Sequence, residues 1–300
     1  MKNKTISTKV AITTMAISCI AMAIDAAPVW DTNTYKTISY TNNSADTTGY
    51  GAVSYEYGIG KTEVSIANWS TFYNDAGSGK VGTFASDYNT YSSLGADAPA
   101  VKIRYREAAQ YCNWLTTGSA LSGAYTIDGS GNVTAINRDY RNGQGLVYVL
   151  PTENEWYKAA YFKADGSGYS LYANGSGIAP VESADGSTGW NYGSASPVDV
   201  WTVGKGTREQ NGTYNMMGNI WEWMDDGTGV IRGGRYDSPS LNLRATSRTA
   251  TSPTSQSAGV GFRVAVIRTP PKLSLILITS FFECIYAPKN IAGFSRTPRY

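Results

Sequence analysis

The chain of 300 residues contains no histidine. Without an imidazole it cannot form a Ser-His-Asp triad or a Cys-His pair, so these common forms of nucleophilic catalysis are excluded. Histidine ligands for iron, copper or zinc are excluded as well. A metal site in this sequence would be built from oxygen atoms, which favours calcium or magnesium.

Cysteine is also scarce. The three cysteines, Cys19, Cys112 and Cys284, lie far apart and form no CxxC motif. This spacing indicates neither a thiolate metal site nor a dithiol redox centre. Only Cys112 lies inside the segment that we predict to be the folded core, so no disulfide is expected to stabilise it.

Charged residues are scarce as well. Charged residues make up 16% of the chain, against about 25% in an average soluble domain, and the net charge is +2. This net charge is too small to imply a nucleic-acid partner, and we expect none. Hydrophobic residues make up 42%, which is enough for a sizeable core.

Residues 1–26 are predicted to be a secretion signal. Three lysines within the first nine residues precede the apolar run Val10–Ile24, and small residues suited to cleavage follow. The run is short for a membrane-spanning helix. The alternatives are a buried N-terminal helix and lipidation at Cys19, which lies in a poor lipidation motif. Export predicts a periplasmic, cell-surface or secreted protein.

Residues 269–300 are predicted to be an atypical tail. Its apolar run, Leu273–Phe282, is about half as long as a bilayer-spanning helix requires. The sequence assigns this tail no role. The remaining residues, 27–268, form the predicted core, which we expect to be one domain without a stable membrane span.

Three short helices are predicted in the core. Ser65 is a helix-capping residue, and apolar residues follow it at helical spacing. A second helix is predicted over residues 105–115, with Cys112 on its apolar face and therefore inside the core. Thr152 and Glu155 form a T-x-x-E capping box that begins the third helix.

Strands in the core are predicted to be short. They lie over residues 50–59 and 259–265, and a third short strand, within 230–234, runs into a glycine turn. Stretches rich in glycine, serine and asparagine separate the helices and strands and are typical of loops. The sequence therefore predicts an α+β fold with few short helices, short strands and much irregular loop.

The densest pattern is the segment Asn215–Trp223. Its two tryptophans flank Glu222 and would lie on the opposite face of an extended segment. A carboxylate beside two large aromatic side chains needs a cation or hydrogen-bond donors. Calcium bound by oxygen atoms meets this need, and so does an ion pair with an arginine such as Arg232 or Arg235. The spacing does not separate these interpretations.

Two further groups of charged residues have alternative interpretations. Glu222 with Asp225 and Asp226 offers paired carboxylates of the kind that hydrolyse glycosides, although such clusters are more often solvated faces or cation sites. Arginines in the last part of the core offer an anion site, although arginines in loop-rich folds more often bind carbonyls and carboxylates. These arginines are Arg232, Arg235, Arg244, Arg248 and Arg263.

Several segments carry a family resemblance. Leu150–Trp156 matches the pattern L-P-T-E-x-E-W, and Asn215–Trp223 matches x-M-x-G-N-V-W-E-W. Further matching segments, in chain order, are Ile59–Ser65, Ala109–Leu115, Ile231–Gly234 and Gly261–Val264. Together they resemble the formylglycine-generating (sulfatase-modifying factor) enzyme family over nearly the whole core.

The resemblance implies the C-type-lectin-like α+β fold of the formylglycine-generating enzymes, and it implies bound Ca²⁺. Carried over by position, one calcium site would use the side chains of Asn215 and Glu222 with the carbonyls of Gly218 and Ile220. A second site would begin at Asn174 and Gly175, with Asp185 as a further ligand.

One departure from the family concerns the reaction itself. The family's oxidase places two cysteines shortly after its R-G-G motif, where they bind copper and attack the substrate cysteine. The corresponding segment here, Arg235–Arg244, has no cysteine, and Ser238 stands near the first position. A serine hydroxyl replaces a thiolate neither in copper binding nor in disulfide exchange. Related branches use histidine ligands for iron. We therefore expect no catalytic residues, no copper or iron, and no formylglycine-generating activity.

The leading hypothesis is an exported, calcium-stabilised binding module. Its tyrosine- and asparagine-rich loops would bind a glycan or a protein ligand at the cell surface, because aromatic faces stack on sugars and peptides. The alternative is an enzyme, either of the formylglycine-generating type or a carboxylate-based hydrolase, that uses residues not recognised in the sequence.

Overall fold

The computed structural model describes residues 29–76, 80–82, 84, 87–140, 145–183, 186–193 and 200–269. The predicted secretion signal, 1–26, and the predicted tail beyond Thr269 lie outside these residues. Among the helices of the described residues, each is too short or too polar to cross a membrane.

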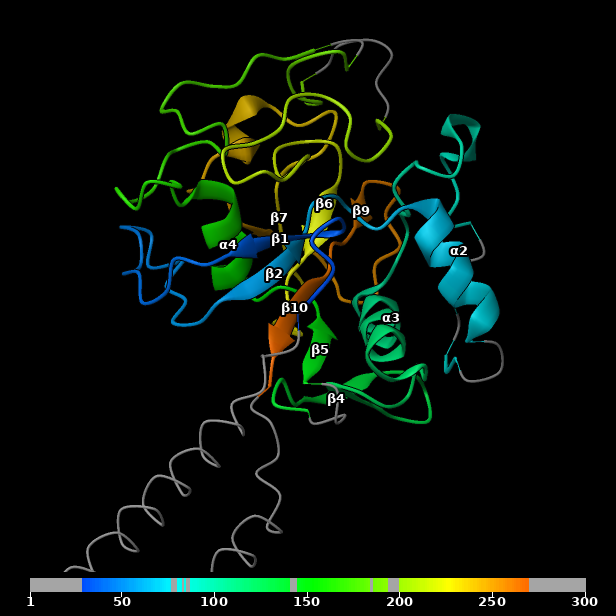
Figure 1. Cartoon of the computed structure of the whole chain (residues 1–300). Helices are drawn as coiled ribbons and strands as arrows, with labels where there is room; N and C mark the ends of the chain where they lie inside the picture. Colours follow the sequence, from blue (N-terminus) through cyan, green and yellow to red (C-terminus); the bar gives the residue numbers. More distant parts are fainter. Residues whose placement is uncertain are drawn as a thin grey trace, which may run out of the picture. The chain divides into compact units, whose positions relative to one another are not determined.

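The fold is α+β, with three short α-helices in the described part of the chain. They are α2 (Ile66–Asp75), α3 (Tyr105–Thr117) and α4 (Glu153–Tyr161), and two 3₁₀ turns lie at Ser92–Leu94 and Ser240–Leu243. Long irregular loops connect them (Figure 1). This confirms the predicted class of fold.

Each helix begins where the sequence predicted. The side chain of Ser65 accepts a hydrogen bond from the Asn68 amide at 3.3 Å and caps α2. At α4 the capping box is complete, because the Thr152 amide donates to Glu155 at 2.7 Å and the Glu155 amide donates to Thr152 at 3.2 Å. Cys112 lies on the buried face of α3, as predicted.

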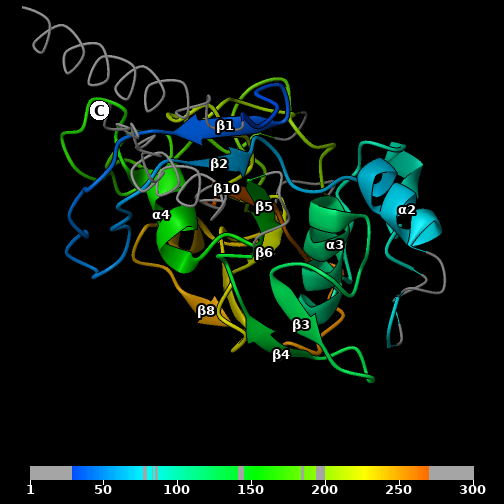
Figure 2. The ribbon, with the colours of Figure 1, turned by 60° about the horizontal axis from the view of Figure 1, so that its bottom comes forward.

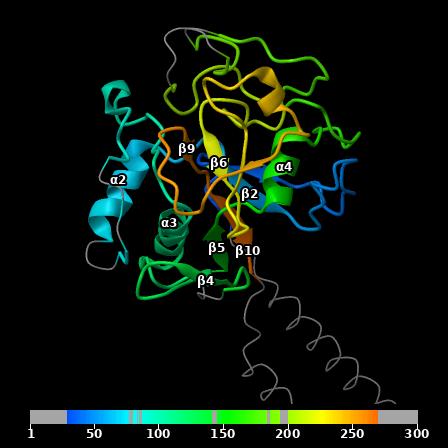
Figure 3. The same cartoon turned by 180° about the vertical axis from the view of Figure 1, so that it is seen from behind.

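The first sheet has four strands in the order β1-β2-β10-β5, and all neighbours are antiparallel. Its strands are β1 (Tyr35–Ile38), β2 (Tyr57–Gly60), β10 (Ala265–Arg268) and β5 (Leu146–Val149). Figure 1 shows α4 on one side of this sheet and α3 on the other, and Figure 3 shows the same arrangement from behind.

The second sheet also has four strands, in the order β8-β7-β6-β9. Its strands are β8 (Thr249–Ala250), β7 (Val230–Arg232), β6 (Trp221–Trp223) and β9 (Val260–Gly261), of which only β6 and β9 pair in parallel. A separate hairpin of β3 (Tyr125–Ile127) and β4 (Val133–Ile136) packs against α3 (Figure 2).

Two strand predictions were wrong in their limits. The predicted strand 50–59 is ordered as a strand only from Tyr57. The predicted closing strand 259–265 is two strands, β9 and β10, which belong to different sheets. The chain leaves one sheet and enters the other at residues 262–264, where the Phe262 carbonyl accepts from the Val64 amide at 2.9 Å and the Val264 carbonyl accepts from the Gly60 amide at 2.7 Å.

Candidate functional site

Glu222 lies at the centre of the fold, fully buried in β6. The Arg263 guanidinium binds both of its oxygens, with Nε 2.6 Å from Oε2 and Nη2 2.6 Å from Oε1. The Trp156 indole of α4 donates to Oε2 at 2.7 Å. Because Arg263 lies between β9 and β10, this bidentate pair joins the two sheets.

An ion pair with an arginine is one of the two interpretations of Glu222 that the sequence left open. Glu222 forms an ion pair, but neither arginine named for it is the partner. Arg232 pairs with Glu153 at 2.6 Å, and Arg235 pairs with Asp237 at 2.5 Å. The prediction that arginines in this region bind carboxylates and carbonyls agrees with these contacts.

Two more buried carboxylates surround the same arginine. Glu63 accepts hydrogen bonds from the amides of Asn219, at 2.8 Å, and Asn215, at 3.3 Å. Glu209 accepts from the Thr213 hydroxyl at 2.9 Å. Burial raises the pKa of both Glu63 and Glu209 to about 7, although the positive charge of Arg263 opposes the shift.

The sequence did not identify Glu63 and Glu209 as members of this buried centre. Glu63 lies in one of the motifs that carry the family resemblance, but its partners Asn215 and Asn219 lie far along the chain. Nor did the sequence identify Arg138, which binds both oxygens of Glu155, at 2.6 and 2.7 Å, and so holds the capping box from outside the helix. Only the fold brings these residues together.

The predicted calcium ligands of the first site lie in the turn that leads into β6. Gly218 has a φ of 85°, and a side chain there would meet the Asn191 carbonyl oxygen at 2.0 Å, so the turn requires glycine. Both Glu222 oxygens are bound by Arg263, and the Asn215 amide donates to Glu63. These side chains do not fit a calcium ion as they stand, since Ca²⁺ would have to displace the guanidinium. Calcium binding stays a prediction.

The second predicted calcium site is described only in part. Asn174 accepts a hydrogen bond from the Ser176 amide at 3.0 Å, and the Gly175 amide donates to the Tyr172 carbonyl at 3.1 Å, so both belong to a local turn. Asp185 lies outside the described residues. Among the residues that are described, no group of three or more Asp, Glu or Cys side chains is placed to hold a metal ion.

Ser238 follows the R-G-G segment, near the position at which the resemblance predicts the first cysteine of an oxidase. Its hydroxyl accepts from the Arg235 amide at 3.0 Å, and its own amide donates to the Arg235 carbonyl at 2.9 Å, so the side chain closes a turn. The one thiol among the described residues, Cys112, is buried, and burial raises its pKa well above the usual range.

The remaining carboxylates of the proposed hydrolase cluster also bind neighbours within the protein. Asp225 pairs with Arg138 at 2.5 Å and accepts from the hydroxyls of Tyr125, at 3.0 Å, and Tyr105, at 3.2 Å. Asp226 accepts from the Thr228 hydroxyl at 2.7 Å and holds a turn. These contacts are structural, and they do not favour a hydrolytic pair.

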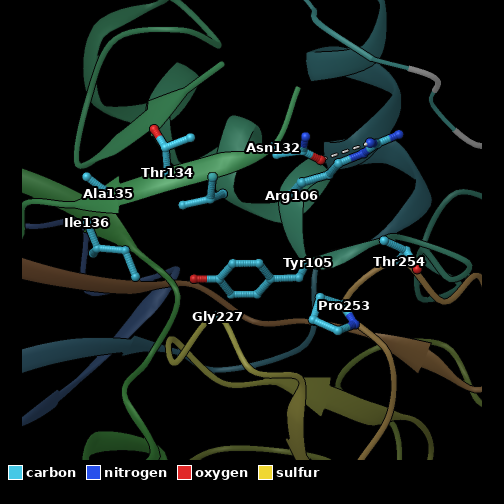
Figure 4. Close-up of a pocket in the computed structure, with 10 residues that line it drawn as sticks. Tyr105, Arg106, Asn132, Thr134, Ala135, Ile136, Gly227, Pro253 and Thr254 are labelled. Atoms are coloured by element: carbon cyan, nitrogen blue, oxygen red, sulfur yellow. Dashed lines mark hydrogen bonds between the residues drawn. The ribbon is translucent and has the colours of Figure 1, made fainter. Parts of the chain in front are cut away.

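A pocket of about 240 Å³ lies beside β4 (Figure 4). Tyr105 crosses its centre, and Ile136 of β4 forms one side. The Tyr105 hydroxyl belongs to the Asp225 network, and Arg106 donates to Asn132 at 3.4 Å. The polar side chains of this pocket are thus directed to the protein itself.

Comparison with known proteins agrees with this architecture. A family model described as sulfatase-modifying factor enzyme 1-like domain matches residues 40–268. Among solved structures, the chain is similar to Treponema denticola variable protein 1, with 22% identity and a TM-score of 0.53 over 79% of this chain and 95% of that one. It is also similar to CarF, with 18% identity and a TM-score of 0.56 over 79% of this chain and 98% of that one. No match was found among curated protein sequences. The expected fold is confirmed.

Proposed function

This chain belongs to the family of sulfatase-modifying factor enzyme 1-like domains, and we propose that it is an exported binding module without formylglycine-generating oxidase activity. Its ligand would be a glycan or a protein at the cell envelope. The fold would serve as a rigid scaffold, because function resides in sites on a fold and not in the fold itself.

The observation that carries this proposal is the chemistry around Ser238. The oxidase reaction needs two thiolates after the R-G-G segment, and the hydroxyl that stands near the first position is used to close a turn. The other chemistry of the family needs histidine, of which the chain has none. Cys112 does not substitute, because it is buried in α3 and its pKa is raised.

Calcium is not part of this proposal. The buried Arg263 already neutralises Glu222, so the fold has an internal counter-ion where a bound cation was expected. The enzyme alternative, a carboxylate-based hydrolase, is less favoured because Asp225 is tied to Arg138 and Glu222 to Arg263.

A glycan array tests the binding role. The full chain would be applied in a buffer with calcium and again with chelator. We expect binding to a subset of glycans in both buffers. Binding that is lost in chelator would show that the protein binds glycans through calcium. No binding in either buffer would contradict a glycan ligand and leave a protein ligand.

A further inference from the structure

A second pocket of the structure is lined by cationic side chains. It has a volume of about 460 Å³, within the size range of small-molecule sites. It lies between β1, the turn after β2, the C-terminal end of α4 and the loop 208–212 (elements labelled in Figures 1 and 2). Five cationic side chains line it: Lys36, Lys61, Lys158, Lys163 and Arg208.

This concentration of charge does not follow from the composition. The chain has 25 Lys and Arg residues against 23 Asp and Glu. One fifth of its cations nevertheless line one pocket, and none of the described lining residues is acidic. Among the described residues, no salt bridge joins any of these five side chains to a carboxylate. Asp165 acts on Lys163 only at longer range.

One of the residues that line the pocket is a buried lysine. Lys158 of α4 is fully buried, and its ammonium donates to the carbonyls of Tyr40 and Val53. Burial lowers its pKa to about 8, while Glu155 opposes the shift. A buried ammonium whose partners are neutral carbonyls gains from an anion placed beside it, because the local dielectric is low.

Hydrogen bonds within the protein hold one wall of the pocket, the loop 208–212, in place. The amide side chains of Gln210 and Asn211 donate to the carbonyls of Ala160, at 2.9 Å, and Phe162, at 2.6 Å, at the end of α4. A side chain at Gly212 would lie 3.4 Å from the Lys36 stem, so this lysine packs closely on the loop. The loop 208–212 is thus held against the end of α4 without a ligand, and a wall that is already in place lowers the entropy that binding costs.

An aromatic ring stands at the rim. Tyr40 lines the pocket and is 51% exposed, which is high for a tyrosine. Its ring packs against Phe162, with centroids 5.0 Å apart, and against Gly166. A half-exposed ring held in place beside a cationic pocket offers an apolar face on which a sugar ring can stack.

We propose that this pocket binds a saccharide that carries sulfate or phosphate groups. The oxyanions would lie among Lys36, Lys61 and Lys163, and the sugar ring would lie on Tyr40. Sulfate and phosphate esters share the tetrahedral oxyanion that lysines recognise as point charges. This inference rests on the proposed binding role, and it names the site and the ligand class of that role.

Isothermal titration of the full chain tests the proposal. The probes are a sulfated disaccharide, the same disaccharide without sulfate, a phosphorylated monosaccharide and inorganic pyrophosphate. We compare the wild type with Lys36→Gln/Lys61→Gln/Lys163→Gln. A matched control, Lys80→Gln/Lys102→Gln/Lys205→Gln, removes the same charge from residues that do not line the pocket.

The expected result is binding of the sulfated or the phosphorylated saccharide, and the pair of probes decides which. The pocket variant should bind roughly 10- to 100-fold more weakly, since it loses three partly exposed charge contacts. The control variant should bind as the wild type does. Tyr40→Ala should weaken saccharide binding and leave any binding of pyrophosphate unchanged.

Three results would overturn the inference. Equal losses in the pocket and control variants would show a response to net charge alone. Pyrophosphate binding as tightly as the charged saccharides would show that the sugar is not recognised. No binding of any anionic probe would remove the site, while the wider binding role would still stand if the glycan array gave signal with neutral glycans. All variants are first checked for native thermal unfolding.

Discussion

Removing the Arg263 guanidinium should destabilise the fold strongly. Arg263 and Glu222 are both fully buried, and Glu63 and Glu209 lie within electrostatic range of the same cation. Arg263→Met would leave three buried carboxylates without a cation. Loss of one partner of a buried pair costs about 3–5 kcal/mol, a large part of the roughly 5–15 kcal/mol that stabilises a domain.

Removing the charge of the other partner, Glu222, should cost less stability. Glu222→Gln keeps the hydrogen bond to Trp156 possible and leaves the arginine beside Glu63 and Glu209, which can ionise to balance it. The structure therefore predicts an asymmetry between the two partners. The double variant should be less destabilised than the sum of the single variants, because each single variant leaves an unbalanced charge.

Urea unfolding followed by tryptophan fluorescence measures these effects. With a denaturant slope of about 1–3 kcal/mol per M, Arg263→Met should lower the midpoint by at least about 1 M. The control is Lys102→Met, whose partner Asp87 is 59% exposed, and it should change stability by about 0–1 kcal/mol. A change at Arg263 as small as that at Lys102, or a larger cost for Glu222→Gln than for Arg263→Met, would refute the reasoning.

Four further predictions concern Glu209, Cys112, the cap of α4 and calcium. Burial raises the pKa of Glu209 from its ordinary value of about 4.5 to about 7, so the folded state keeps this proton to higher pH than the unfolded chain does. This contribution to stability is present at low pH and is lost as pH rises from about 4.5 to about 7. Glu209→Gln should therefore lose less stability relative to the wild type at pH 8 than at pH 5 in urea titrations, and an equal or greater loss at pH 8 would contradict the assignment. Cys112 should resist alkylation in the native state and react in denaturant, as peptide mapping by mass spectrometry would show; rapid native labelling would mean that α3 opens. Thr152→Ala should cost about 1 kcal/mol in urea unfolding through loss of the α4 cap, with Thr152→Ser as the control that keeps the hydroxyl. Because Arg263 already balances the charge of Glu222, added calcium should leave the thermal midpoint of the wild type unchanged relative to chelator, and a rise with calcium would show that the protein binds the ion.

Features encoded by neighbouring residues could be predicted from the sequence. The helix starts at Ser65 and Thr152 depend on hydrogen bonds within three residues, so the motif alone specifies them. The inward position of Cys112 follows from helical spacing in the same way. The family resemblance was likewise carried by short ordered motifs, and the match over residues 40–268 confirms it.

Features that depend on distant pairing could not be predicted. The spacing around Glu222 showed that a counter-charge was needed, but Arg263 becomes its partner only because the chain changes sheets at residues 262–264. The single predicted strand over 259–265 failed for the same reason. The five cations of the 460 Å³ pocket come from four separate segments of the chain. A net charge of +2 therefore could not predict that they lie together.

The most direct test of the central claim is an oxidase assay on the full chain. A peptide with a sulfatase-type cysteine motif would be incubated with the protein, copper, reductant and oxygen, and the cysteine would be followed by mass spectrometry. We predict that the cysteine is unchanged, because Ser238 closes a turn where the oxidase needs a thiolate. Conversion to formylglycine would contradict the account, and its loss in Cys112→Ser would identify the thiol responsible.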